Sequence, residues 1–465
     1  MPRLLVLVLT TIFLMTGTAA ADPAMADPPP LPPGTPLPSD SVAPDLDYQV
    51  KTRCVQSAPG TETLLQMPWG QTRLRVDELH RFVEHPGAGQ TVVVIDTGVH
   101  PHDFLGDRLS GGGDLVVPAD NGLADCDGHG TLVAGIIAAS PPEGSRIGFR
   151  GIAPEARIIS IRQTSKHYEG TPAPTPDDPR PQARPAGTVP TLARAIMRAA
   201  NLAQHGVLTM SVNRCRSAAE GPILAEERQV QAALRFAVED RDVVVVASAG
   251  NTGEGGCPAQ NPDSDPDPSR PSRIVIPAWF DDHVLSVAAI DRDGNPASFS
   301  VAGPWVGVGA PGTEVTSLDP GNSTTLANRL YDKEGRPTQI QGTSFAAPYV
   351  AGTAALVRQR FPTLTARQVM HRIKATAVHP ATATGRDDRV GSGMINPMAA
   401  LTAMIPEEHG IPADRPTTIT ATLPPPAHRD RTPAVVALIG AAGGGVALLV
   451  TLFVVHTVRR TRRPG

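Results

Sequence analysis

The segment TVVVIDTGV, residues 91–99, runs from five consecutive β-branched residues directly into the turn-forming sequence Asp96-Thr97-Gly98. An unbroken apolar run of this kind is typical of a strand buried on both faces of a parallel sheet. Four similar runs follow, at 156–161, 206–212, 243–250 and 284–290. Helical patterns lie between and after them, at 129–139, 189–204, 224–240, 344–360 and 365–376. This alternation predicts right-handed β-α-β crossovers and one α/β domain, with helices on both faces of a parallel sheet.

The composition limits the possible classes of protein. The chain has 465 residues, of which 40% are hydrophobic and 18% charged. Such a chain can bury one large core and still carry accessory segments. The formal net charge is −4, which argues against nucleic acid as a partner because a nucleic-acid-binding protein presents a basic face.

The two ends of the chain carry different apolar segments. Residues 1–21 are typical of a secretory signal peptide, with Arg3, a short apolar run and Ala19-Ala20-Ala21 before the expected cleavage. That run is too short to span a bilayer comfortably, so a cleaved signal is favoured over an anchor. Residues 434–455 contain no charge, and this length can cross ~30 Å of hydrocarbon. A buried core helix is the alternative for this second segment.

The charges that flank the second segment predict its orientation. The sequence RRTRR follows at 459–463, and basic residues remain on the cytoplasmic side of a membrane. We therefore expect residues 456–465 to form a cytoplasmic tail and the body of the protein to lie outside the cell membrane.

Proline-rich sequence divides the rest of the chain. Residues 22–66 are expected to form an extended N-terminal arm and 405–433 a stalk. The folded domain is expected at 67–404 and is interrupted at 163–188 by a polar, proline-rich insertion, most simply a mobile surface loop.

Four polar residues are predicted at strand ends or helix starts. They are Asp96, His129, Asn251 and Ser344. Each has an ordinary structural alternative. Asp96 and Asn251 could be turn residues, His129 a helix cap or a surface residue, and Ser344 in GTSFAAPYVAG (342–352) a helix cap. Jointly they favour a catalytic site, because the carboxyl ends of parallel strands meet at one edge of a sheet.

The four residue types match the needs of acyl transfer. Ser344 would attack a carbonyl, while His129 takes and returns its proton and Asp96 orients the imidazole. The Asn251 amide and the Ser344 backbone N–H would bind the developing oxyanion. This chemistry requires neither a cofactor nor a metal. Acidic residues near Asp265–Asp267 are read as solvated loop rather than as a calcium site.

The segments VVVIDTGV, DGHGTLVAGIIA, ASAGN and GTSFAAPYVAG, in this order, resemble the four signature segments of the subtilisin-type (subtilase) serine proteases. The resemblance covers roughly residues 69–404. It implies a subtilisin-like fold and endopeptidase activity on protein or peptide substrates, with the triad and oxyanion roles given above. It also assigns Ser211 and Gly342 to substrate binding. Asn213 departs from the family pattern, which has glycine there, and this puts the primary specificity pocket in doubt.

The layout of the whole chain is similar to that of the mycosins, the membrane-anchored subtilases of type VII secretion systems. The shared features are a signal peptide, a proline-rich arm, four cysteines, DCDGHGT, a long insertion, a stalk, one membrane span and a basic tail. This resemblance implies that components of the secretion membrane complex are partners. It also implies a second role, in supporting that complex independently of proteolysis.

Four cysteines allow three disulfide connectivities, and an exported protein is expected to pair them. Cys215 follows the strand of Ser211 and Cys257 follows the Asn251 loop. If these strands are neighbours, their ends emerge side by side, which favours Cys215–Cys257. Cys54 would then tie the arm to Cys126.

The length and composition of the arm bear on whether it is an inhibitory segment. Residues 22–66 are too short and proline-rich to bury a core of their own, so we interpret them as a retained arm rather than an inhibitory pro-domain.

The leading hypothesis for the function is an active extracytoplasmic endopeptidase. The alternatives are a structural subunit that uses the fold as an assembly surface and, third, a surface adhesin built on the same scaffold.

Overall fold

The computed structural model describes residues 27–58, 66–411 and 432–461, except for 177, 222, 256, 262–270 and 333. The expected signal peptide and Asp265–Asp267 lie outside these residues. The chain divides into two compact units, Met1–Ile411 and Pro412–Gly465.

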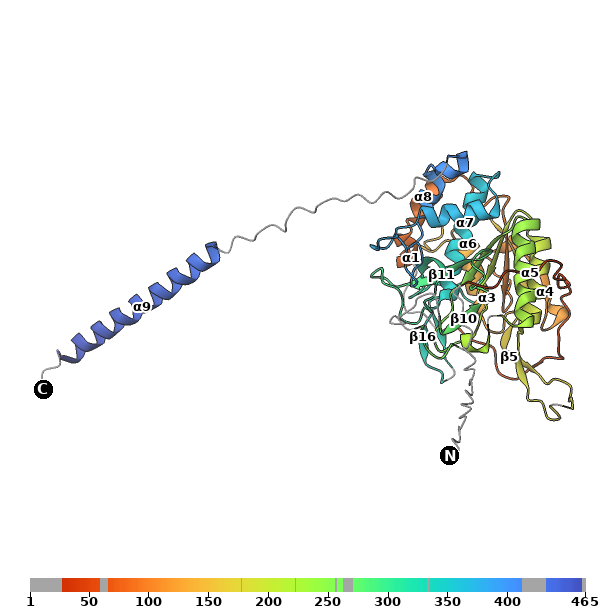
Figure 1. Ribbon diagram of the computed structural model, residues 1–465, viewed down its shortest axis with the longest axis horizontal. Coiled ribbons are helices and arrows are strands. Elements are labelled where there is room, and N and C mark those ends of the chain that lie inside the picture. The colour runs from red at the N-terminus through yellow and green to blue at the C-terminus, as the bar shows by residue number, and fades with distance from the viewer. Residues whose placement is uncertain are drawn as a thin grey trace, which may run out of the picture. The chain divides into compact units, whose positions relative to one another are not determined.

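A seven-stranded sheet organises the first unit (Figure 1), with the strand order β12-β11-β9-β7-β2-β4-β3. All of its neighbouring strands are parallel. In that order the strands are Val306–Pro311, Leu285–Ile290, Val244–Ser248, Val207–Met210, Thr91–Asp96, Arg157–Arg162 and Leu109–Asp114. The five inner strands are the five apolar runs predicted from sequence. The two edge strands were not predicted, because glycines interrupt LSGGGD and VGVGAP.

Helices cover both faces of this sheet, as predicted. The five main helices are α3 (His129–Ala138), α4 (Val189–Leu202), α5 (Ala225–Arg235), α6 (Thr343–Arg360) and α7 (Ala366–Ala375). Helices α4 and α5 pack against each other, as do α3 and α6, and Figure 1 shows the two pairs on opposite sides of the sheet.

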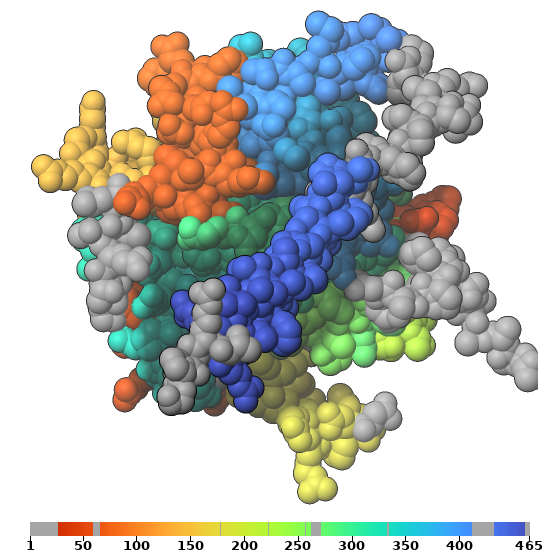
Figure 2. All heavy atoms as spheres, turned by 90° about the vertical axis from the view of Figure 1, so that its left-hand side faces the viewer, coloured from red at the N-terminus to blue at the C-terminus, as the bar shows by residue number. Residues whose placement is uncertain are grey.

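Shorter elements complete the unit. The helices are α1 (Trp69–Arg73), α2 (Val76–Phe82) and α8 (Pro397–Thr402). The strands are β1 (Gln49–Val50), β5 (Ser165–Gly170), β6 (Arg184–Ala186), β8 (Arg214–Ser217), β10 (Arg273–Ile276), β13 (Ser317–Leu318), β14 (Leu326–Ala327), β15 (Arg329–Tyr331) and β16 (Pro337–Gln339). Figure 2 shows α1 and α2, in orange, beside the light-blue residues near the end of the domain. Gln359, on α6, donates to His85 O at 2.9 Å and so connects α6 to the segment that follows α2.

The insertion is not simply a loop, and this corrects the expectation for 163–188. Its strand β5 pairs antiparallel with β1 of the arm and with β6. Tyr48, Val116 and Ala186 form a small separate core beneath this three-stranded sheet. The two ends of the proline-rich insertion pair with each other through β5 and β6, and the arm adds β1 as a third strand.

The arm follows the surface of α4 and α5. Gln231 Nε2 donates to Pro29 O at 2.8 Å, and Arg194 Nη1 donates to Ala43 O at 2.7 Å. A proline-rich backbone offers many carbonyl acceptors but few N–H donors, so side chains of the domain supply the donors.

The domain also extends past its expected end. Residues 405–411, expected in the stalk, belong to the compact unit. Arg372 and Glu408 form an ion pair with side chains only 2% and 6% exposed, and Arg372 also donates to Ala403 O. The second unit contains α9, Thr432–Thr461. Its segment Thr432–Arg460 contains an 18-residue window with a mean hydropathy of 2.4 and is long and apolar enough to cross a membrane.

Candidate active site

Asp96 and His129 meet at the carboxyl end of β2, an inner strand of the sheet. Asp96, the last residue of β2, is fully buried, and its Oδ1 lies 2.7 Å from His129 Nδ1. Asp96 Oδ1 also accepts from Thr97 N at 2.8 Å. The Nδ1 atom must carry its hydrogen to donate to the carboxylate, which leaves Nε2 of the neutral ring free to act as a base.

Glycine allows α3 to approach the Asp96 turn this closely. A Cβ atom on Gly130 would lie 2.0 Å from Gly98 O and 3.1 Å from Asp96 Cβ. Because His129 is the first residue of α3, this close contact sets the position of the imidazole relative to Asp96.

Burial and charge act in opposite directions on the pKa of His129. Burial of the ring lowers the pKa, whereas the charge and hydrogen bond of Asp96 raise it, with a smaller lowering by Lys166 and a smaller raising by Asp125. The pKa of His129 is raised overall. The side chain remains 28% exposed, so the imidazole can be reached from the surface of the domain.

Asp125 is a site residue that the sequence interpretation missed. Its two oxygens accept from Thr97 Oγ1 and Thr131 Oγ1, both at 2.7 Å, and from Gly128 N and Thr131 N, both at 2.8 Å. The carboxylate thus connects the Asp96 turn to the start of α3. Burial raises the pKa of Asp125 to about 6, against the hydrogen bonds, which lower it. Its position four residues before His129 was the available signal.

Ser344 is the second residue of α6, and it does not cap the helix. The helix starts at Thr343 with Gly342 as the N-cap residue. Ser344 Oγ donates to Ser211 O at 3.3 Å, and Ser211 Oγ donates to Ser344 O at 2.9 Å. Ser211 is therefore in direct contact with Ser344 through two hydrogen bonds.

The imidazole contacts the start of α6 through an aromatic ring. The rings of His129 and Phe345 have centroids 4.9 Å apart, and Phe345 is the next residue after Ser344. No hydrogen bond between Ser344 and His129 is present among the described residues. The structure thus brings Asp96 and His129 into direct contact and places Ser344 on the adjacent helix start.

The Asn251 side chain forms hydrogen bonds through both its amide oxygen and its amide nitrogen. Its Oδ1 accepts from both Thr343 N and Thr343 Oγ1 at 2.9 Å. Its Nδ2 donates to Glu254 Oε2 at 3.1 Å. A Cβ on Gly342 would be 3.4 Å from this Nδ2, so Gly342 lies directly beside the amide. Glu254 is a second residue that the sequence interpretation did not identify.

Asn213, the residue that departs from the family pattern, forms a hydrogen bond to the strand that precedes Asn251. Its Nδ2 donates to Ser248 Oγ at 3.0 Å, and Ser248 is the last residue of β9. The Asn213 amide therefore braces the strand that leads to Asn251.

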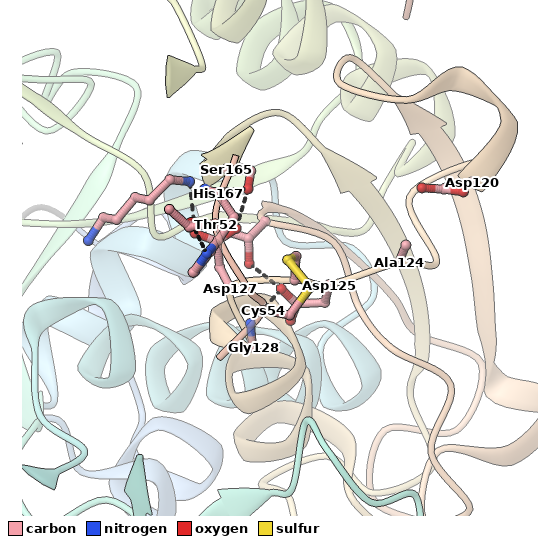
Figure 3. Close-up of a disulfide and its surroundings, with 12 residues drawn as sticks. Thr52, Cys54, Asp120, Ala124, Asp125, Asp127, Gly128, Ser165 and His167 are labelled. Atoms are coloured by element: carbon pink, nitrogen blue, oxygen red, sulfur yellow. Dashed lines mark hydrogen bonds between the residues drawn. A yellow bond between two sulfur atoms is a disulfide. The ribbon is translucent and has the colours of Figure 1, made fainter. Parts of the chain in front are cut away.

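Two disulfides frame the site, Cys54–Cys126 and Cys215–Cys257, the pairing favoured from sequence. The first joins the arm to the loop before His129. Figure 3 shows Cys54 beside Asp125 and Asp127, with Thr52 and His167 close by.

Hydrogen bonds reinforce this junction. Thr52 Oγ1 lies 2.7 Å from His167 Nδ1. Asp127 accepts from Ser165 Oγ and, at 2.8 Å, from Lys166 N. The arm, the insertion and the His129 loop are thus connected directly, while the second disulfide joins the end of the Ser211 segment to the Asn251 loop.

Comparison with known proteins finds a matching family and similar relatives. Residues 87–393 match the subtilase family. Mycosin-1 of Mycobacterium tuberculosis is 44% identical over 458 residues, which cover 94% of this chain and 96% of that protein.

Solved structures of similar chains include proteins of type VII secretion systems. The serine protease MycP1, described as an essential component of the type VII (ESX-1) secretion system, is 41% identical, with a TM-score of 0.72 and coverage of 81% of this chain and 100% of that chain. A chain of the intact ESX-5 inner membrane complex is 37% identical, with a TM-score of 0.74 and coverage of 93% and 100%.

Proposed function

Because this chain belongs to the subtilase family of serine proteases, and within it to the mycosins of type VII secretion systems, we propose that it cleaves peptide bonds with an Asp-His-Ser triad outside the cell membrane. The observation that carries the proposal is the 2.7 Å contact between Asp96 Oδ1 and His129 Nδ1. A histidine oriented by a buried carboxylate, next to a serine at a helix start, has the parts needed for acyl transfer.

In the proposed reaction Ser344 Oγ attacks the substrate carbonyl carbon as its proton passes to His129 Nε2. The tetrahedral intermediate then collapses, and the imidazolium returns the proton to the leaving amine. Water repeats the sequence on the acyl-enzyme and releases the acid. Asp96 stays ionised throughout and stabilises the charged ring.

The Ser344 hydroxyl has to change partners before attack. It donates to Ser211 O at 3.3 Å, a long hydrogen bond for a hydroxyl donor. In the proposed reaction the hydroxyl turns from this carbonyl to the imidazole when substrate binds, since catalytic hydrogen bonds often tighten only in the substrate complex.

Two donors would stabilise the oxyanion. The Ser344 N–H is one of the four N–H groups at the start of α6 that the helix cannot satisfy, and the helix dipole favours negative charge there. Asn251 Nδ2 is the second donor, aimed by the two bonds from Thr343 to the Asn251 oxygen. Loss of one such donor typically costs ~3 kcal/mol in the barrier.

A serine-directed fluorophosphonate tests the nucleophile. The full-length protein in detergent should become labelled, and Ser344→Ala should abolish labelling while the fold, followed by circular dichroism, is unchanged. Equal labelling of the variant would contradict the assignment.

We also propose the placement of the remaining segments. Residues 1–21 are a signal peptide, 22–66 a retained arm, 67–404 the peptidase domain with its insertion at 163–188, and 405–433 a stalk that begins within the compact unit. Residues 434–455 span the membrane, and 456–465 face the cytoplasm. The long apolar helix Thr432–Thr461 supports the anchor, and Arg459 and Arg460 at its end support this orientation.

A structural role in a secretion complex is the second candidate function. It is supported by the likeness of 93% of this chain to a chain of an ESX-5 inner membrane complex. The sheet of β1, β5 and β6 supplies a surface that does not include the proposed catalytic atoms. In a deletion strain, Ser344→Ala should restore assembly of the complex if this role is separate from proteolysis.

A further inference from the structure

The Asn251 amide nitrogen, proposed to bind the oxyanion, already donates a hydrogen bond to a carboxylate. Glu254 Oε2 accepts from Asn251 Nδ2 at 3.1 Å. The other end of the Asn251 side chain is fixed by Thr343, so the amide cannot turn its nitrogen elsewhere without losing those bonds. An oxyanion would have to replace the Glu254 carboxylate at this nitrogen.

The backbone of Glu254 is held close to Asn251. Glu254 N donates to Asn251 O at 3.3 Å, and Glu254 O accepts from Cys257 N at 2.9 Å. The Cys215–Cys257 disulfide fixes the end of this short loop. The side chain itself is 58% exposed, so it can rotate away from Asn251 while its backbone stays in place.

Lys166, on strand β5, supplies a cation that completes the arrangement. Lys166 Nζ lies 3.8 Å from Glu254 Oε1, and the lysine side chain is 79% exposed. The backbone of Lys166 is bound to Asp127, two residues before His129. The ion pair therefore connects the loop of the catalytic histidine to the loop of the oxyanion amide. Ion pairs this exposed contribute little to stability, so another cation can replace Lys166.

We propose that Glu254 is a specificity-determining residue, which favours substrates with a cationic side chain on the acyl side of the scissile bond. The inference rests on the proposed serine mechanism. The oxyanion is the carbonyl oxygen of that substrate residue, so its side chain lies near Asn251 and within reach of Glu254. A lysine or arginine there pairs with the carboxylate and draws it off Asn251 Nδ2. An acidic side chain is repelled, and the carboxylate stays on the amide.

The test uses three peptides that differ only in lysine, glutamine or glutamate at that position. For the full-length protein in detergent, kcat/KM should be higher for the lysine peptide than for the glutamate peptide by about tenfold, the size expected from two exposed charge interactions. Glu254→Gln keeps the side-chain size and should reduce this ratio to within about twofold, mainly by faster cleavage of the glutamate peptide. High salt should compress the wild-type ratio.

Two matched variants control for general effects of charge. Lys166→Gln leaves the carboxylate in place and should keep the lysine preference, and its loss would overturn the proposal by assigning selectivity to Lys166. Glu143→Gln removes an exposed carboxylate from another loop and should leave the ratio unchanged. An unaltered ratio in Glu254→Gln also overturns the proposal.

Failure of the serine mechanism would be seen separately. If the wild-type protein cleaved none of the three peptides, including the neutral one, the proposed function would be wrong. Calorimetric binding of the same peptides to Ser344→Ala would then still decide the role of Glu254. Equal affinities for the lysine and glutamate peptides would overturn it, whereas a lysine preference lost in Ser344→Ala/Glu254→Gln would support it.

Discussion

Ser211 and Ser344 hydrogen-bond to each other's backbone carbonyls, with Ser211 Oγ to Ser344 O at 2.9 Å and Ser344 Oγ to Ser211 O at 3.3 Å. The first bond has a cause in the sequence. Pro348 lies inside α6 and has no N–H for the carbonyl four residues earlier, which is that of Ser344. The Ser211 hydroxyl supplies the missing donor and so connects the strand end to the start of α6.

Ser211→Ala should therefore destabilise the domain. The substitution leaves the carbonyl of Ser344 buried without its donor, at a cost of about 1–3 kcal/mol. Urea unfolding of the full-length protein in detergent would measure the change. Pro348→Ala restores an N–H to the helix, so the double variant should recover part of the loss, and strictly additive effects would contradict this explanation.

The pH dependence of hydrolysis should report the raised pKa of His129. The base is the neutral ring, so kcat/KM should rise with pH through a pKa above the ordinary value of 6.5, because the Asp96 carboxylate outweighs the opposite effect of burial. Asp96→Asn removes the charge and should move this limb to lower pH. It should also reduce kcat by up to ~10⁴-fold, since the ring can take the wrong tautomer. A limb that stays in place would exclude His129 as the base.

The inner strands and the main helices could be predicted because their signals are local. Five apolar runs and five helical patterns lie within single segments of sequence. The edge strands β3 and β12 could not be predicted in this way, because glycine weakens the local strand signal and pairing with a neighbour compensates. The strands of the insertion were missed for a related reason. Glu169 pairs with Gln49 of the arm, a contact between residues far apart in the chain.

In the proposed site, too, the features with a local sequence signal could be predicted and those that depend on distant or loop contacts could not. The positions of Asp96 and His129 at a strand end and a helix start follow from local pattern, and the structure brings the two together. The carboxylates of Asp125 and Glu254 belong to no apolar pattern, and their contacts depend on side-chain directions within tight loops. Taken alone, the stretch around Ser344 allowed either a cap or a nucleophile, and only its combination with the other three residues favoured the nucleophile. In the structure Gly342 is the residue at the cap position.

Asp125 should position the Asp96–His129 pair. In Asp125→Asn the amide nitrogen replaces one of the two carboxylate oxygens and cannot accept the hydrogen bond from Gly128 N or from Thr131 N, which go to different oxygens. We therefore expect kcat/KM to fall by about tenfold, or ~1.4 kcal/mol. Loss of the charge should also move the His129 limb to lower pH, because Asp125 raises that pKa. Asp107→Asn, which replaces an exposed carboxylate away from this network, serves as the control. An unchanged limb in Asp125→Asn would leave the residue with only a structural role.

Asp125 should also affect stability in a pH-dependent way. Its folded-state pKa is raised to about 6 from an ordinary value of 3.8, so between these values the folded state binds more protons than the unfolded state. The contribution of Asp125 to the free energy of unfolding is therefore greatest below pH ~4 and declines as the pH rises towards ~6. Asp125→Asn should flatten this part of the curve of unfolding free energy against pH. A curve parallel to that of the wild-type protein would contradict the raised pKa.

The arm should stabilise the domain without inhibiting it. Deletion of residues 22–45 removes the contacts of Pro29 and Ala43 with α5 and α4 but retains β1 and the Cys54–Cys126 disulfide. Hydrolysis of a small peptide ester should remain within a few-fold of the intact protein, because these contacts lie on the outer faces of helices. Deletion through Cys54 also removes the disulfide, so it should lower the Tm, by an amount that reflects a typical contribution of about 2–4 kcal/mol. Reductant should lower the Tm of the intact protein and of the shorter deletion towards that of the longer one. A rate increase of about a hundredfold or more on deletion of 22–45, equivalent to ~2.7 kcal/mol of relieved inhibition, would instead identify the arm as a pro-domain.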